Sequence, residues 1–398
     1  MLTFESNKIK YDYSQCQQCG VCEMVCPKNA ITIKFLENGT HTVTIDEEKC
    51  IKCQKCVKCC PSNKNLYNEA YLEEMPHKLY FFGYNKDNTI RRASSSGGAC
   101  KTLIIDSLKQ GLVDGVYTLR KLATYPSGEG TFFTKDNIPS YDELANSVYH
   151  SVMIGSNIDK VKKCDRLMIV GTSCQLRALE VALKGKYKEL VKVCIFCKQQ
   201  KTLESTRFLA KVMGTTIPKN LNFSTRYRGD GWPGIVRVRE AELPWNRAAQ
   251  LPFGRRLWTV PGCNVCGDPL GMECGADVTL MDPWCIRSTN DLGETLVTVH
   301  TEKGLELIKK CKNLISESKT YQEIKLALGE TDIWRKRSLV PYFRGNKCCK
   351  NVQRAGWAET FQRKFLISLV ETLPALPIFF YRVIYKFPDL RNFILKQK

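Results

Sequence analysis

Two short segments of the chain repeat one arrangement of cysteines. Each has the spacing Cys-x2-Cys-x2-Cys-x3-Cys-Pro, and the two copies end at Pro27 and Pro61. Three thiolates two residues apart let a tight loop surround one cube of iron and sulfur, and the proline then turns the chain away. In two-cluster proteins of this spacing, the fourth cysteine of each run binds the cluster of the other run. We therefore predict two [4Fe-4S] clusters, one held by Cys16, Cys19, Cys22 and Cys60 and the other by Cys50, Cys53, Cys56 and Cys26.

Zinc and disulfide bonds are the alternative uses of such cysteines. Zinc takes pairs of cysteines more often than triplets, and disulfides need an oxidising compartment. Cys59 lies next to Cys60 but outside the spacing, so we do not count it as a ligand.

The length and composition place these clusters in a larger redox protein. The chain has 398 residues, of which the cysteine repeats use about 60, and a chain of this length has two or three domains. The first residues, MLTFESNKIKYDY, lack the order of a signal peptide, and 21 cysteines without an export signal indicate a reducing cytoplasm. The remaining residues are then expected to exchange electrons with the clusters.

The charge favours acidic partners. The net charge is +20, of which residues 1–62 contribute only +1. Such a field attracts an acidic electron carrier, an anionic lipid surface or a cofactor with phosphates and carboxylates. Nucleic acid is the partner we favour least, because the basic residues are scattered and no recognition motif accompanies them. A dispersed, solvated basic surface is the alternative for most of these charges.

A second group of cysteines lies in the body of the chain. Cys263 and Cys266 form a CxxC pair in a loop rich in glycine and proline, a composition suited to metal binding. A third cluster would need four thiolates from this pair and Cys174, Cys194, Cys197 and Cys274. Buried, reduced cysteines are the alternative.

Strands and helices alternate between these cysteines. A strand is predicted within 77–87, and strand–helix units within 165–185 and 190–214, which indicates an α/β body. Paired strands are expected on either side of a turn at 229–234. The loop of Ser94, Ser95, Ser96, Gly97 and Gly98 precedes a helix, where backbone N–H groups and hydroxyls bind phosphate. An ordinary flexible turn has the same composition.

Several motifs occur together in a fixed order. They are the cysteine repeats, Ser94 to Gly98, Gly171-Thr172-Ser173-Cys174-Gln175, Phe196-Cys197, Cys263-x2-Cys266, and Ala276-Asp277 followed by Asp282-Pro283-Trp284. In this order the chain resembles the beta-subunit family of coenzyme F420 hydrogenases and dehydrogenases over roughly residues 1 to 300. The resemblance implies an FAD-binding α/β body with a further [4Fe-4S] cluster.

The resemblance also implies roles for individual residues. Ser94 to Gly98 look like part of the flavin site, together with Gly171, Thr172, Asp277 and Asp282. Cys174, Cys197, Cys263 and Cys266 look like the ligands of the third cluster, with Cys174 the least certain. The two aspartates could instead cap a helix or a turn.

The chemistry expected at such a site is oxidation and reduction. Clusters pass single electrons, and a flavin holds one or two, so a flavin couples them to a two-electron reaction. The four histidines form no hydrolytic arrangement with a serine or paired carboxylates that the sequence reveals. No catalytic residue is assigned.

The C-terminal part changes pattern after Thr331. Apolar residues have helical spacing from Val352 to Leu369, and a second apolar stretch starts at Leu373. Charged residues and prolines interrupt it, so we do not expect a membrane span. A basic amphipathic tail could rest on an anionic membrane surface, and packing against the body or a partner subunit is the alternative.

These observations predict three parts. Residues 1–65 form an α+β ferredoxin-like domain with two [4Fe-4S] clusters, 76–330 an α/β flavin-binding domain, and 331–398 a helical tail. We expect a cytoplasmic iron–sulfur flavoprotein oxidoreductase that takes electrons from ferredoxin or reduced deazaflavin. The resemblance also extends to proteins of surface polysaccharide biosynthesis. The alternative is an electron-transfer subunit without a substrate of its own, serving a larger redox complex.

Overall fold

Two β-hairpins frame the N-terminal cysteine repeats. The structure is a computed structural model that describes residues 1–63, 68–286, 291–372 and 379. Both hairpins are antiparallel, and a small core that includes Leu2, Ile31 and Val43 holds them together. The elements of this N-terminal domain (residues 1–63) are β1 (Leu2–Glu5), β2 (Lys8–Tyr11), α1 (Val21–Met24), β3 (Ile31–Phe35), β4 (His41–Ile45) and α2 (Lys55–Cys59).

An eight-stranded sheet forms the centre of the body, by which we mean residues 68–372. Its strand order is β15-β5-β14-β13-β9-β8-β6-β7. Strands β13, β9, β8 and β6 are parallel, whereas β14, β15 and β7 pair antiparallel with their neighbours. The strands are β5 (Leu79–Asn85), β6 (Gly115–Lys121), β7 (Gly128–Thr134), β8 (Arg166–Gly171), β9 (Glu189–Ile195), β13 (Val278–Met281), β14 (Thr295–Val299) and β15 (Leu314–Lys319).

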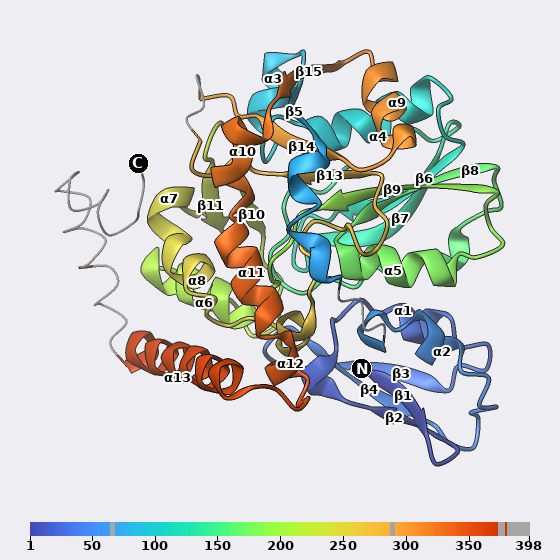
Figure 1. The fold of residues 1–398 in the computed structure, drawn as a ribbon, viewed down its shortest axis with the longest axis vertical. Helices are drawn as coiled ribbons and strands as arrows, with labels where there is room; N and C mark the ends of the chain where they lie inside the picture. Colours follow the sequence, from blue (N-terminus) through green and yellow to red (C-terminus); the bar gives the residue numbers. More distant parts are fainter. Residues whose placement is uncertain (64–67, 287–290, 373–378, 380–398) are drawn as a thin grey trace.

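Helices cover both faces of this sheet. On one face, α4 (Ala99–Lys109) and α9 (Glu302–Lys310) bury apolar side chains against strand residues such as Val116. On the other face, α5 (Ser173–Ala182) does the same. The N-terminal domain packs beneath α5, as Figure 1 shows, and Val21 of α1 belongs to the same apolar core. Helix α3 (Asn88–Ala93) lies between β5 and α4 in the chain.

A smaller three-stranded sheet packs beside the main one. Its antiparallel order is β10-β11-β12, and its apolar core includes Phe208 and Trp258. Its elements are α6 (Leu203–Val212), β10 (Thr225–Tyr227), β11 (Ile235–Val238), β12 (Ala241–Pro244), α7 (Trp245–Ala248) and α8 (Gln250–Gly254).

Helices follow the last strand. They are α10 (Tyr321–Leu328), α11 (Glu330–Ser338), α12 (Val340–Phe343) and α13 (Lys350–Thr372). One side of α13 packs on the smaller sheet through Leu366, Ile367 and Val370. Within the described residues, no helix has the length and apolar character needed to cross a membrane. The second apolar stretch, from Leu373 onward, lies outside the described residues apart from Phe379.

The structure confirms the expected alternation of strands and helices. The strands and helices predicted within 77–87, 165–185 and 190–214 correspond to β5, to β8 with α5, and to β9 with α6. The paired strands predicted around the turn at 229–234 are β10 and β11. A mixed α/β architecture with a separate N-terminal iron–sulfur domain is thus present.

Candidate iron–sulfur centres and flavin site

The two cysteine repeats share one backbone conformation. Gln18 and Lys52 follow corresponding positions of the two repeats, and both have left-handed backbone angles, with φ of 61° and 56°. Gly20 and Gln54, which precede α1 and α2, are also left-handed, with φ of 73° and 58°. A non-glycine residue in this conformation is uncommon, and two pairs at matching positions show that both loops are wound in the same way.

The thiols of the repeats form the two predicted sets of four. Burial, followed by the negative charges of Cys22, Cys16 and Cys60, raises the pKa of the Cys19 thiol. Cys60 of the second repeat is therefore a neighbour of the first set.

The second set in turn includes one cysteine of the first repeat. Burial raises the pKa of the Cys56 thiol to about 11, and the charges of Cys26, Cys50 and Cys53 add to this effect. Cys26 of the first repeat thus lies with the second set, as the crossed assignment requires. Thiols whose pKa is raised by each other's charge are suited to binding metal cations, which offset that repulsion.

The geometry of these sets differs from a single-ion site. Among the described residues, no three His, Cys, Asp or Glu side chains converge closely enough to hold one metal ion. Ligands of a zinc ion all reach one centre at about 2.3 Å, whereas each thiolate of a four-iron cluster binds a different iron.

The two sets differ in their surroundings. A cavity next to the second set is lined by its four cysteines and by Lys28, Ile51 and Lys55, and Cys53 is exposed. The first set faces the body, because Cys19 packs against the apolar core beneath the main sheet. We call the second set the outer thiols and the first set the inner thiols.

A third set of four thiols lies in the body. Burial, followed by the charges of Cys263, Cys174 and Cys266, raises the pKa of Cys197. Cys174 lies in the first turn of α5, Cys197 follows β9, and the CxxC pair lies on a 3-10 turn at Pro261–Val265 and its end. The structure thus brings together Cys174, Cys197, Cys263 and Cys266, which we call the body thiols.

Two other cysteines form a separate pair. The Cys274 thiol donates a hydrogen bond to the carbonyl of Gly271 at 3.1 Å, and a hydrogen bond with Cys274 raises the pKa of Cys194. Both are buried, and the thiol charges that raise the pKa of Cys174 come from Cys266 and Cys263. Cys174 rather than Cys274 therefore completes the body thiols.

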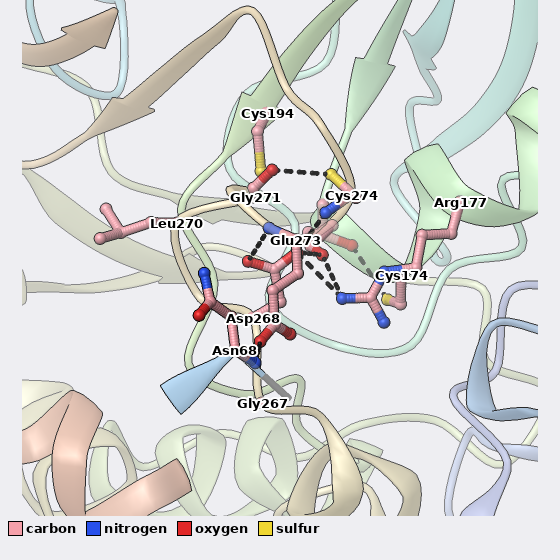
Figure 2. Close-up of polar contacts among 12 residues, drawn as sticks. Asn68, Cys174, Arg177, Cys194, Gly267, Asp268, Leu270, Gly271, Glu273 and Cys274 are labelled. Carbon is pink, nitrogen blue, oxygen red and sulfur yellow. Dashed lines mark hydrogen bonds and ion pairs between the residues drawn. The ribbon is translucent and has the colours of Figure 1, made fainter. Parts of the chain in front are cut away.

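A buried carboxylate positions the loop that carries Cys266. Asp268 accepts hydrogen bonds from the Tyr71 hydroxyl and from Nη2 of Arg177, both at 2.9 Å, and from the Ser173 hydroxyl. It also accepts from the backbone N–H groups of Glu273 and Cys274 (Figure 2). Because Ser173 and Arg177 belong to α5, this carboxylate fixes the loop against the helix that presents Cys174.

The Ser/Gly loop lies at the C-terminal edge of β5. The Ser94 hydroxyl donates to the carbonyl of Ile90, the Ser96 hydroxyl to that of Glu294, and the Ser95 hydroxyl accepts from the N–H of Ser147. The O–H donors of Ser94 and Ser96 are therefore used within the protein, whereas Ser95 only accepts a hydrogen bond and keeps its O–H donor for a phosphate.

The backbone of the same loop has free donors. The N–H groups of residues 95–98 donate to no acceptor among the described residues. Gly98, with φ of 79°, precedes the N-terminus of α4, where the helix dipole favours an anion. This part of the loop keeps the geometry expected for phosphate.

Gly171 and Thr172 lie at the same edge of the sheet, at the end of β8. The side chain of Thr172 and that of Gln175 form a capping box at the start of α5. The Thr172 hydroxyl is 3.3 Å from the thiol of Cys174. Four inter-strand steps of about 4.8 Å separate β5 from β8, so the Ser/Gly loop and the body thiols lie roughly 19 Å apart along this edge.

Asp277 lies at the opposite end of β13 and does not join this group. Its carboxylate accepts from the backbone N–H of Lys192 at 2.8 Å and from the hydroxyl of Thr301 at 2.7 Å. Thr301 is the N-cap of α9. Asp277 thus connects β9 with the N-cap residue of α9, at the end of β13 opposite Asp282.

Asp282 ends β13 at the expected edge and meets a buried arginine. Nη2 of Arg228 is 3.1 Å from the carboxylate of Asp282, and the Arg228 side chain is fully buried. The rings of three tryptophans surround its guanidinium, at 4.6 to 5.1 Å from their centroids: Trp232, Trp284 and Trp245. Sequence analysis did not identify Arg228; its only signal was a turn with an aromatic residue on either side.

Tyr149 connects this group with the body thiols. Burial, followed by the negative charge of Asp282, raises the pKa of Tyr149, and the charge of Cys197 acts in the same direction. Tyr149 is thus within electrostatic reach of both Asp282 and a body thiol. An electron at the body thiols would have a short distance to cover to a cofactor beside Asp282.

Family models match both parts of the chain. Two models described as 4Fe-4S dicluster domains match residues 15–64 and 42–88. The N-terminal part of the coenzyme F420 hydrogenase/dehydrogenase beta subunit matches residues 80–138, and the C-terminal part matches residues 164–322. These last two matches include the Ser/Gly loop, Arg228, Asp282 and all four body thiols.

Individual relatives are more distant. A ferredoxin-like protein of the nif region of Sinorhizobium fredii is 48% identical over 40 residues, which is 10% of this chain and 55% of that protein. A chain of the F420-reducing [NiFe] hydrogenase complex from Methanosarcina barkeri is similar in structure with a TM-score of 0.48 at 17% identity. That similarity covers 65% of this chain and 88% of the other.

Proposed function

The chain belongs to the coenzyme F420 hydrogenase/dehydrogenase beta-subunit family, and from this we propose that it is an iron–sulfur flavoprotein oxidoreductase. It would move electrons between ferredoxin-type [4Fe-4S] clusters and a two-electron acceptor bound at FAD. The observation that carries the proposal is the succession of three thiol sets from the exposed Cys53 to the buried Cys263, with Asp282 and the body thiols both within electrostatic reach of Tyr149. When bound, the flavin supplies the step between one-electron and two-electron chemistry.

The contact between the two domains supports electron passage from the inner to the body thiols. Gly262, next to Cys263, packs so closely on the backbone of Cys16 that a Cβ atom would lie 2.1 Å from its carbonyl oxygen. Arg344 also donates to the carbonyls of Ser62 and Val265, one from each domain. The loops of two thiol sets are therefore in direct contact.

The chain's own residues would hold each group in place. The free N–H groups of residues 95–98 would bind a phosphate of FAD, and the body thiols would bind a third [4Fe-4S] cluster. Arg228 would fix the carboxylate of Asp282 in place beside the reacting part of the flavin. The substrate at that flavin is coenzyme F420 or another two-electron acceptor, and a role in surface polysaccharide biosynthesis is one setting for it.

Iron content tests the third cluster. The double variant Cys263→Ser, Cys266→Ser should contain about four irons fewer per chain than the wild type, with the N-terminal clusters retained. Cys274→Ser is the matched control, because Cys274 pairs with Cys194 outside the body thiols. Equal iron in the double variant and the wild type would leave these cysteines a structural role.

Hydrogen exchange tests the flavin site. FAD added to the anaerobically purified protein should slow the exchange of the amides of residues 95–98, which have no acceptor in the protein. Residues 300–304, near Asp277 at the other end of β13, should be unaffected. Substituting Gly97 is a poor test, because a Cβ there would lie 2.6 Å from the carbonyl of Gly83 whether or not flavin binds. Wild-type protein that never retains FAD would end the flavoprotein proposal.

An electron-transfer subunit is the second candidate, and the surface of α13 favours it. Trp357, Phe361 and Phe365 are 56–64% exposed and lie in a row one turn apart. A row of exposed aromatic rings is typical of a protein interface. Turnover of an acceptor by the isolated chain, with a reduced ferredoxin as donor, separates the two candidates. No turnover at full cofactor content would favour the subunit.

A further inference from the structure

Two buried lysines lie next to the body thiols. Lys336 of α11 is 4% exposed, and its ammonium donates to the carbonyl of Cys263 at 2.5 Å. Lys201 is 1% exposed, and its ammonium donates to the carbonyls of Pro252 and Leu257 at 2.7 and 2.8 Å. Both amino groups lie in a site that water does not reach.

Both ammonium groups are within electrostatic reach of the body thiols. Burial lowers the pKa of Lys336, while the charges of Cys266, Cys263 and Cys197 oppose that change. Burial likewise lowers the pKa of Lys201, and the charges of Cys263 and Cys197 oppose it. The two lysines thus face the same thiols from different elements, α11 and the segment before α6.

Neither lysine has a carboxylate partner among the described residues. Lys336 and Lys201 donate only to carbonyl and amide oxygens. The neighbouring buried arginines differ, since Arg177 pairs with Asp268 and Arg337 with Glu273, both at 2.9 Å. A buried cation without a counter-charge is costly, so an anion is expected close to both lysines.

A [4Fe-4S] cluster on the body thiols would be that anion. Four thiolates around an oxidised core of two positive charges leave two negative charges, and two lysines would balance them. Reduction adds one further negative charge, which nearby buried cations stabilise. In residues 1–63 no lysine or arginine is buried, and Lys28 and Lys55 beside the outer thiols are exposed to water and salt, which screen their charge. The cation that acts on the inner thiols is the N-terminal ammonium, next to Cys60.

We propose that Lys336 and Lys201 balance the charge of the body cluster and raise its reduction potential above those of the N-terminal clusters. This rests on the proposed function, in that it needs a cluster on the body thiols. The consequence would be a direction of flow: the inner thiols would hold the one-electron donor and the body thiols the acceptor, so that one is oxidised as the other is reduced and no bond is made or broken. The protein then delivers electrons from its N-terminal domain to the acceptor at Asp282.

A redox titration monitored by electron paramagnetic resonance tests this on the full-length protein. Lys336→Met should make reduction of the body cluster at least tenfold less favourable, which is a shift of about −59 mV for one electron. Lys201→Met should shift the potential in the same direction. Lys336→Arg keeps the charge and should restore most of the potential, and Lys325→Met, on the exposed side of α10, should leave it unchanged.

The outcomes separate the two proposals. Wild-type protein without the third set of four irons overturns the proposed function itself. A body cluster whose potential is the same in Lys336→Met and wild type overturns the role of the lysine alone. If Lys336→Met loses the cluster while Lys336→Arg retains it, the charge is needed and the proposal is supported. Loss of the cluster in both variants overturns it, because the shape and not the charge of the side chain would then matter.

Discussion

Cys26 is the residue that distinguishes the crossed arrangement from two independent loops. Although it ends the first repeat, its charge acts on Cys56 of the second. Cys26→Ser should therefore remove the outer cluster and about four irons per chain, and leave the inner cluster spectroscopically intact. Cys59→Ala is the matched control, because Cys59 lies outside the spacing of the repeats and its charge acts on Cys22 of the inner thiols, so the irons of the outer cluster should stay. Loss of the inner cluster instead would mean that each repeat binds its own cube.

Asp268 has a larger structural role than the sequence alone indicated. It is fully buried and accepts from Tyr71, Arg177 and Ser173. Asp268→Asn removes the charge opposite a buried arginine and should destabilise the body by about 3–5 kcal/mol. The body cluster should be lost with it, as an iron assay and thermal unfolding would show. Asp332→Asn, at an exposed carboxylate, is the control; equal stability of the two variants would contradict this role.

At the scale of single residues, the sequence indicated which cysteines belong together but not which buried charges form pairs. Cluster ligands have fixed spacing, so the repeats and the CxxC pair were visible from one chain. Asp268 and Arg177 are 91 residues apart and meet only because β8, α5 and the loop before β13 fold together. Asp277 was misplaced for a related reason: the order of residues does not show which end of a strand a carboxylate faces.

The loop at Pro261–Val265 is the element that joins the two domains. Gly262→Ala would force Cβ onto the carbonyl of Cys16, an overpacking that costs about 1–3 kcal/mol and pushes the domains apart. Iron content should be unchanged, and electron passage from the inner to the body cluster should slow in rapid-freeze experiments. Gly254→Ala is the control, since nothing lies within 4 Å of a Cβ there. Equal rates in both variants would exclude this contact as the site of passage.

The regular elements of the body were predictable because their periodicity is strong. Strands such as β8 are buried on both faces, and α5 has apolar residues at helical spacing. The sequence located the Ser/Gly loop before a helix but did not show that the O–H donors of Ser94 and Ser96 bond to carbonyls of the protein, while the backbone N–H groups remain free. Hydrogen bonds of this kind depend on Ser147 and Glu294, which the sequence places far away.

Across the whole molecule, the three thiol sets follow one another from the exposed outer thiols, through the inner thiols, to the buried body thiols. The outer thiols are open to the surface at Cys53, and the body thiols lie at the C-terminal edge of the main sheet. In parallel sheets this edge is where ligands bind, because the loops that follow the strands meet there. In the proposed function, a protein partner would therefore reach the outer thiols directly, at the exposed Cys53.

Exposed lysines lie beside the outer thiols. Lys28, Lys52 and Lys55 are exposed beside the outer thiols and form no ion pair with a described carboxylate. With a net charge of +20, the protein should attract an acidic donor to this surface, and added salt should weaken that attraction. Replacing all three lysines by glutamate should therefore slow reduction by an acidic ferredoxin roughly tenfold or more at low salt.

Stopped-flow absorbance at several ionic strengths measures this rate. The control changes the same amount of charge elsewhere, in the variant Lys309→Glu, Lys312→Glu, Lys325→Glu, whose lysines are exposed on α9, after it and on α10. If attraction acted through the overall charge alone, both triple variants would slow equally. If the donor docks on a local surface, only the triple variant beside the outer thiols should be reduced more slowly. Its rate of reduction should then rise with added salt, because the glutamates beside the outer cluster repel an acidic donor until ions screen them.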